Sequence, residues 1–254
     1  FYRDGILRAL REAARIVAIS HATADSIRLV APEARARVRV IPHGVEARFH
    51  PAASASTARR DAANVLGSDG ERPYFLVVGQ NAPFKNHGAI LEAFAAADLG
   101  RDVRLVLLQR LYGGKAGRRA EALGLGDRVL WRGPVGADEV VHLMRGALGL
   151  IQFSRSEGFG MPALEAMASG TPVIASDIPA LSEVLGGAGL EVPLDVAALA
   201  KALRRVATEP GLRAELAARG VERARAFSWD ESARLHLETY REAAAAGKPA
   251  KPCG

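Results

Sequence analysis

Hydrophobic and polar positions along this chain follow two alternating patterns. Short apolar runs rich in Val, Ile and Leu predict strands buried on both faces, and longer stretches with a helical period separate them. This succession is typical of βαβ units around a parallel sheet, so the predicted fold class is α/β. The predicted strands are Arg15–Ile19, Val38–Ile41, Tyr74–Val78, Val103–Leu108, Arg128–Trp131, Leu148–Phe153, Pro172–Ala175 and Leu190–Val192.

The stretches with helical periodicity lie between these strands and at the end of the chain. They predict helices at Ala22–Leu29, His87–Ala96, Gly117–Leu123, Ala137–Arg145, Pro162–Ser169, Ala180–Leu185, Val196–Ala207, Pro210–Phe227 and Trp229–Ala244. The segment Pro51–Ser56 is rich in small residues and is predicted to be a linker. Gly113-Gly114-Lys115 lacks the full spacing of a phosphate-binding loop, so an ordinary turn is predicted there.

The predicted strands fall into two groups. The strand-helix-strand segment within residues 1–43 is too short to form a domain and is predicted to be the end of a preceding Rossmann-like domain. Residues 44–228 contain enough strands for one doubly wound, Rossmann-like parallel sheet. In such sheets ligands bind beyond the carboxyl ends of the strands. Residues 229–254 are predicted to form a closing helix and a flexible tail.

Composition excludes some classes of site. The chain has 254 residues, of which 49% are hydrophobic, enough to form a substantial core. Its net charge of +6 comes from arginines scattered along helical stretches, which indicates solvated helix faces and no nucleic-acid partner. Cys253 is the only cysteine, so a disulfide or a cysteine-based metal site is excluded within this sequence. The histidines are not paired as metal ligands would be, and His43 and His87 are predicted to be structural.

The segment from Ser154 to Glu165 is the part of the chain most suggestive of chemistry. It follows a strongly apolar strand and leads directly into a predicted helix. Gly158 and Gly160 allow a ligand to approach the backbone closely, and Pro162 suits the first helical turn. Because the N–H groups at the start of a helix attract anions, this segment predicts a diphosphate site.

Two carboxylates flank this segment. Glu157 lies before the predicted helix and Glu165 within its first turns, so they can bind different parts of one ligand: hydroxyls near a reacting sugar and hydroxyls of a nucleotide ribose. Each glutamate alone also has an ordinary interpretation, Glu165 as a favourable charge near a helix start and Glu157 as a loop residue. The ordered set of strand, Glu-Gly-Phe-Gly, Pro and second Glu is what favours a ligand site.

This ordered set resembles the signature of family 4 glycosyltransferases. The resemblance extends from Ile16 to Tyr240, and it implies a GT-B architecture of two facing Rossmann-like domains. Most of the N-terminal domain of that architecture is expected to be missing, as in a truncated form. Besides Glu157 and Glu165, which are separated by seven residues, the resemblance rests on Ile41–Val45, Val78-Gly79, Lys85-Asn86, Trp131–Gly133, Glu165–Ser176 and Ala180–Val184.

The resemblance implies a retaining transferase that moves a hexose, of glucose or mannose type, from a nucleotide-diphosphate sugar to an acceptor. It implies that no metal and no further cofactor are required. In the family the first glutamate contacts the donor sugar, which corresponds to Glu157, and the second binds the ribose, which corresponds to Glu165. Backbone amides of Phe159, Gly160 and Met161 are expected to contact the diphosphate. Ser154 and Gly158 are expected to contribute to the same site.

A second anion site is expected after the strand that ends at Val78. Gly79 gives a tight exit from the strand, and Lys85 is expected to neutralise the departing diphosphate. The family usually has an arginine soon after this glycine, whereas this chain has Gln80, which carries no charge. Arg110 or Arg155 would have to compensate; otherwise diphosphate binding is expected to be weaker.

The nucleobase is expected near Trp131, Arg132, Gly133 and Val135, where the family uses backbone contacts. Backbone contacts leave little trace in a sequence, so UDP-, GDP- and ADP-linked sugars all stay open as partners. Arg132 is equally well interpreted as an exposed residue.

Two functions from different classes are compatible with these features. One is a glycosyltransferase whose acceptor domain is mostly absent, and the other is a nucleotide-sugar-binding module with little or no transferase activity. A homodimer or a missing N-terminal domain would cover the exposed apolar face. A dinucleotide-dependent oxidoreductase is disfavoured, because Gly79–Phe84 does not match G-x-G-x-x-G. A cytoplasmic location is expected, with peripheral contact at the inner membrane face left open.

Overall fold

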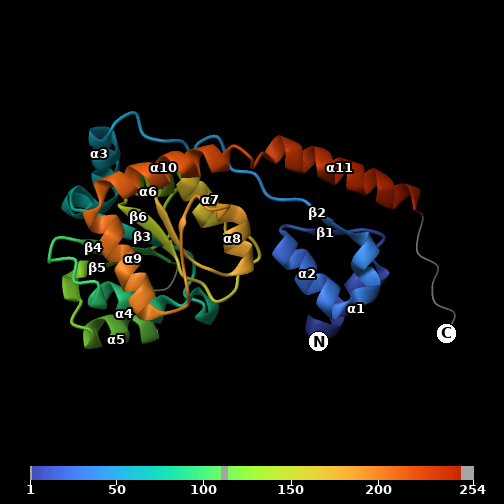
Figure 1. Cartoon of the computed structure of the whole chain (residues 1–254), viewed down its shortest axis with the longest axis horizontal. Coiled ribbons are helices and arrows are strands. Elements are labelled where there is room, and N and C mark those ends of the chain that lie inside the picture. The colour runs from blue at the N-terminus through green and yellow to red at the C-terminus, as the bar shows by residue number, and fades with distance from the viewer. Residues whose placement is uncertain (1, 110–113, 247–254) are drawn as a thin grey trace. The chain divides into compact units, whose positions relative to one another are not determined.

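The computed structural model describes residues 2–109 and 114–246. The chain divides into a smaller unit, residues 1–44 and 227–254, and a larger unit, residues 45–226 (Figure 1). The first division falls between Gly44 and Val45, next to the boundary expected from the sequence. The closing helix belongs to the smaller unit together with the N-terminal residues.

A six-stranded parallel sheet forms the centre of the larger unit, as the apolar runs predict. Its strand order is β5-β4-β3-β6-β7-β8, so the order along the chain reverses between β3 and β6. In open parallel sheets, ligands bind beyond the carboxyl ends of the strands at such a reversal of strand order. The strands are β3 (Tyr74–Val78), β4 (Arg104–Leu108), β5 (Val129–Arg132), β6 (Gly149–Gln152), β7 (Val173–Ser176) and β8 (Leu190–Val192).

Helices cover both faces of this sheet (Figure 1). Alternate residues such as Phe75 and Val77 pack with α4, α5 and α9 on one face. On the other face the Tyr74 hydroxyl donates a hydrogen bond of 2.6 Å to the Leu143 carbonyl in α6. The helices are α3 (Ala55–Leu66), α4 (His87–Ala96), α5 (Gly114–Ala122), α6 (Ala137–Gly146), α7 (Met161–Ala168), α8 (Pro179–Leu185), α9 (Val196–Thr208) and α10 (Pro210–Ala224).

The smaller unit contains a two-stranded parallel sheet, β1 (Ile16–Ala18) and β2 (Val38–Val40). Its helices are α1 (Tyr2–Glu12), α2 (His21–Val30) and α11 (Trp229–Ala245), with a 3-10 turn at Pro32–Arg37. Side chains of α11 hold the sheet: Arg39 pairs with Glu238 at 2.8 Å and with Glu242 at 3.2 Å, and Arg15 pairs with Glu242 at 3.1 Å. None of the helices in the described part of the chain is long and apolar enough to cross a membrane.

Two helices escape the sequence prediction, α1 and α3. The predicted linker Pro51–Ser56 overlaps the start of α3, because the Ser54 hydroxyl accepts a hydrogen bond from the Thr57 N–H at 3.1 Å and caps the helix. The turn predicted at Gly113-Gly114-Lys115 is wrong for its last two residues, which begin α5, and Gly113 lies outside the described residues.

Candidate functional site

The candidate site lies where the strand order reverses, at the carboxyl ends of β3 and β6. The loop after β3 carries Lys85, and the loop after β6 carries Glu157. The Arg155 N–H donates a hydrogen bond of 2.7 Å to the Phe84 carbonyl, which ties the two loops together. Residues far apart in the sequence are therefore held side by side at this point.

The path of the loop after β3 is set by Gly79. Its φ of 137° lies in the region that favours glycine, and its N–H bonds to the Leu108 carbonyl at 3.1 Å. A 3-10 turn, Pro83–Lys85, then ends at Asn86 in the left-handed conformation. This turn brings the Lys85 side chain back over Gly79, where a Cβ atom would lie 3.7 Å from Lys85 Cε. The sequence prediction that Gly79 and Lys85 share one site is consistent with this geometry.

The carboxylate of Glu157 is the centre of a hydrogen-bond cluster. Its Oε1 atom accepts from Lys85 Nζ at 2.6 Å, from Ser154 Oγ at 2.6 Å and from Gln152 Nε2 at 3.1 Å. The side chains of Lys85 and Glu157 are 16% and 10% exposed, so water screens this ion pair only weakly. The pair thus places a cation and an oriented carboxylate together at the carboxyl ends of β3 and β6.

Gln152 belongs to this cluster and was not predicted from the sequence. It is buried, and besides donating to Glu157 it accepts a hydrogen bond of 3.0 Å from the Ala163 N–H at the start of α7. Gln152 therefore fixes the position of Glu157 relative to α7. A polar residue at the end of an otherwise apolar strand was the only signal for it in the sequence.

The start of α7 differs in one respect from the sequence expectation. Pro162 has no N–H and the Ala163 N–H already bonds to Gln152, so the first turn offers a ligand fewer amides than a helix N-terminus usually does. Gly160, the N-cap, has φ 115°, and Phe159 is buried beside it. A Cβ atom on Gly160 would lie 2.6 Å from Leu181 Cδ2, so the close turn needs glycine.

Glu165 lies in α7 and is partly buried. Burial, with a smaller contribution from the nearby carboxylate of Glu46, raises its pKa to about 7. Within the residues that the structure describes, the Glu165 side chain has no hydrogen-bond or ion-pair partner. A partly buried carboxyl without a partner is a good acceptor for ligand hydroxyls.

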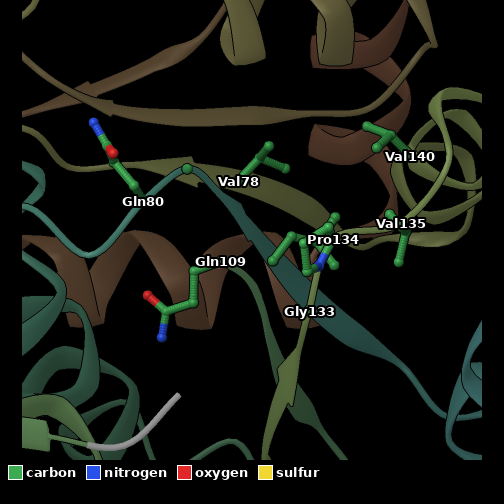
Figure 2. A pocket seen from close by; sticks show the side chains of 9 residues that line it. Val78, Gln80, Gln109, Gly133, Pro134, Val135 and Val140 are labelled. Atoms are coloured by element: carbon green, nitrogen blue, oxygen red, sulfur yellow. The ribbon is translucent and has the colours of Figure 1, made fainter. Parts of the chain in front are cut away.

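A pocket of about 390 Å³ opens between the ends of β3, β4 and β5. Gly79, Gln80, Gly133 and Val135, which the sequence predicts near a nucleotide, all line it (Figure 2). Gln109 lines it as well and was not predicted. The pocket is thus a candidate for the nucleobase.

Two predicted arginines, Arg132 and Arg155, do not line this pocket. The Arg132 guanidinium bonds to the Leu66 carbonyl at 3.3 Å and does not line the pocket. Arg155 is exposed and lines a separate cavity of about 540 Å³ with Asn86. Arg110 lies outside the described residues, so its predicted contact with the diphosphate stays a prediction.

Over residues 2–109 and 114–246, no group of three or more His, Cys, Asp and Glu side chains lies close enough together to hold a metal ion.

Comparison with known proteins identifies the family. The model of the family described as Glycosyl transferases group 1 matches residues 58–225. D-inositol 3-phosphate glycosyltransferase of Actinosynnema mirum is 33% identical to the chain, over 93% of the chain and 59% of the relative. MMP alpha-(1->4)-mannosyltransferase of Mycolicibacterium hassiacum is 30% identical to the chain, over 94% of the chain and 56% of the relative. The chain thus spans somewhat more than half the length of these two curated relatives.

Solved structures share the fold. Sucrose-phosphate synthase from Thermosynechococcus elongatus has a TM-score of 0.77 and 29% identity, over 91% of the chain and 58% of that structure. HepE of Anabaena, solved in complex with UDP and glucose, has a TM-score of 0.79 and 20% identity, over 92% of the chain and 64% of that structure. The six-stranded parallel sheet corresponds to the GT-B fold of such enzymes, as the sequence predicts. The chain belongs to the Glycosyl transferases group 1 family.

Proposed function

We propose that the larger unit binds the donor of a retaining glycosyltransferase, a nucleotide-diphosphate sugar that supplies a hexose. The observation that carries this proposal is the contact of 2.6 Å between Lys85 Nζ and Glu157 Oε1 at the point where the strand order reverses. A cation and a carboxylate held together there suit a ligand that has both an anionic part and hydroxyl groups.

Lys85 has the electrostatic role in this proposal. When the bond between the anomeric carbon and the diphosphate oxygen breaks, negative charge develops on the diphosphate, and a nearby ammonium group lowers the energy of that state. An acceptor oxygen forms the new bond on the same face of the sugar, and its proton leaves with the diphosphate. Lys85 therefore exchanges its contact with Glu157 for one with the diphosphate when the donor binds.

Glu157 has the positioning role. Ser154 and Gln152 also donate hydrogen bonds to its Oε1 atom, so the carboxylate stays in place after Lys85 turns to the diphosphate. It then accepts hydrogen bonds from hydroxyls of the donor sugar. Glu165 binds the ribose hydroxyls, and the backbone from Phe159 to Met161 contacts the diphosphate. No step of this scheme uses a metal ion.

The name of one relative, a mannosyltransferase, supports a hexose donor, and the two names together leave the acceptor open. One relative is named a D-inositol 3-phosphate glycosyltransferase and another an α-(1→4)-mannosyltransferase. The activity of the whole protein is itself part of the proposal, because the chain spans little more than half of either relative. A second candidate follows from the same observation: a module that binds the nucleotide sugar with little or no transfer.

Calorimetric titration of the chain with UDP, GDP and ADP tests the proposal. At least one nucleotide should bind, and Lys85→Met should weaken its binding about tenfold or more, because a charge-assisted contact to the diphosphate is lost. Lys201→Met, which removes an exposed lysine on α9, is the matched control and should leave affinity unchanged. If none of the three nucleotides binds, the proposal is wrong.

A transfer assay then separates the two candidates. The chain is incubated with radiolabelled sugar nucleotides and candidate acceptors, and labelled product is measured. Product that is lost in Lys85→Met supports the transferase, whereas donor binding without product supports the binding module.

A further inference from the structure

Three residues form one row at the carboxyl end of the sheet, and only one of them has a side chain. The Gly79 N–H bonds to the Leu108 carbonyl at 3.1 Å, and the Gln109 N–H bonds to the Arg132 carbonyl at 3.0 Å. These bonds continue the pairing of β3 with β4 and of β4 with β5, so Gly79, Gln109 and Gly133 end neighbouring strands. All three line the pocket of about 390 Å³. Gln109 therefore supplies the side chain of this row.

The Gln109 amide is buried and unsatisfied. The residue is 4% exposed, yet neither Nε2 nor Oε1 has a hydrogen-bond partner in the described part of the chain. Gln152 provides an internal contrast, since it is 5% exposed and uses both amide atoms, on Glu157 and on the Ala163 N–H. A buried amide without partners costs free energy, so such a group calls for a specific explanation, and a ligand in the adjoining pocket provides one.

The rest of the pocket lining is largely apolar. Val78, Val135 and Val140 line it, and Gln80 and Gln109 lie on the side opposite Gly133 to Val135 in the close-up (Figure 2). Gln80 is exposed, so water competes for its amide, whereas the Gln109 amide is shielded. Pockets of this kind orient a flat apolar ligand through a small number of polar groups.

We propose that Gln109 recognises the hydrogen-bonding edge of the nucleobase and thereby sets which nucleotide the chain prefers. The proposal rests on the donor site proposed above. A primary amide presents one acceptor next to two N–H donors, and it matches a base edge that presents a donor next to an acceptor. Uracil, guanine and adenine each have such an edge at a different position on the ring, so one fixed amide favours the base whose edge reaches it.

The histidine next to Gln109, His87, carries no charge at neutral pH. Burial, with a smaller contribution from the nearby Lys85 ammonium, lowers the pKa of His87 to about 4, although the Gln109 amide acts in the opposite direction. The ring is therefore neutral at pH 7, and its Nδ1 atom has no hydrogen-bond partner in the described structure.

The experiment measures nucleotide preference as a ratio of dissociation constants. Calorimetry gives the affinities of UDP, GDP and ADP for the wild-type chain and for Gln109→Met, which keeps the length of the side chain and removes its hydrogen bonds. We expect the preferred nucleotide to bind about tenfold more weakly and the preference to fall to within about threefold. Binding of inorganic pyrophosphate should not change. Asn64→Met, an exposed amide on α3, is the matched control.

Stability provides a second readout. Because Gln109→Met removes a buried amide without partners, the variant should unfold at the same temperature as the wild type or higher. If Gln109→Met does not fold, Gln109→Asn keeps the amide but withdraws it from the pocket, and it should lose the preference as well.

The outcomes distinguish this inference from the proposed function. If the wild type binds nucleotides and the variants keep its preference, or if the wild type has no preference, Gln109 does not recognise the base and the donor site stands. If the wild type binds none of the three nucleotides, the donor site itself is wrong, and this inference fails with it.

Discussion

A single carboxylate oxygen, Glu157 Oε1, accepts hydrogen bonds from Lys85, Ser154 and Gln152. Because only Lys85 brings a positive charge, the other two donors position the carboxylate without neutralising it. Removal of Lys85 therefore leaves a shielded negative charge, whereas removal of both charges leaves only neutral groups.

A double-mutant cycle tests this difference. Lys85→Met should lower the free energy of unfolding by roughly 1–3 kcal/mol, less than for a fully buried pair because the pair is partly exposed. In the background of Glu157→Gln the same change should cost less, because no carboxylate is left without its partner. Urea denaturation of the wild type, the two single variants and the double variant measures the coupling. Equal effects in both backgrounds would show that the pair does not contribute to stability.

The partly buried Glu165 should make stability depend on pH. Its pKa is raised to about 7 in the folded chain, mainly by burial, so between about pH 4.5 and 7 the folded state keeps a proton that the unfolded state has lost. Stability should therefore fall as pH rises through this window, by at most about 3 kcal/mol. Denaturant unfolding from pH 5 to pH 8 measures this change. In Glu165→Gln this decrease in the free energy of unfolding should be much smaller. An unchanged decrease in the variant would show that other groups cause it.

Among the elements, α7 is the one whose start is most constrained. Gly160 caps it with φ 115° beside Leu181, and Gln152 bonds to the N–H of Ala163. Both constraints act on the loop that carries Glu157. The start of this helix thus serves both the stability of the larger unit and the geometry of the candidate site.

Gly160→Ala should therefore affect both stability and ligand binding. The added Cβ atom would be both strained at this φ and in contact with Leu181, so stability should fall by about 1–3 kcal/mol and nucleotide binding should weaken. Gly117→Ala is the matched control, since nothing lies within 4 Å of the added atom and alanine favours a helix. Thermal unfolding should show a lower midpoint for the first variant and an equal or higher one for the second. Equal midpoints for Gly160→Ala and the wild type would contradict the packing seen at Leu181.

The sequence predicts the strands well and some helices poorly, for physical reasons. Strands of a parallel sheet buried on both faces are continuous apolar runs, so Tyr74–Val78 is predicted with its observed bounds. Helix α3 was missed because the small residues before it resemble a linker, whereas the cap by Ser54 depends on backbone geometry. Gln109 and Gln152 were missed because a glutamine at a strand end acquires a role only from residues that are distant in the sequence.

At the scale of the whole molecule, the smaller unit depends on the last helix of the chain. Arg15 and Arg39, which flank or belong to its two strands, both pair with carboxylates of α11. Gly44 packs so closely on the backbone at Trp229 that an added Cβ atom would lie 2.1 Å from the Trp229 nitrogen. Residues from the two ends of the chain therefore form one folded unit.

Removal of residues 229–254 should loosen the smaller unit and spare the larger one. Without α11 the two short strands lose the ion pairs of Arg15 and Arg39, and a two-stranded sheet is only marginally stable alone. Hydrogen exchange should show faster exchange at β1 and β2 and unchanged protection from β3 to β8. Loss of protection in both units would show that they fold as one cooperative body.

The reversal of strand order also has a consequence for folding. Strands β3 to β5 follow one another along the chain, as do β6 to β8, so each half of the sheet can form from near-neighbour contacts. The two halves of the sheet meet at β3 and β6, where Phe75 pairs with Gly149 and Leu76 with Leu150, and this pairing requires a long loop to close. Lys85 and Glu157 lie on opposite sides of that seam. A donor can therefore bind only after the seam has closed, and its binding energy adds to the stability of the completed sheet.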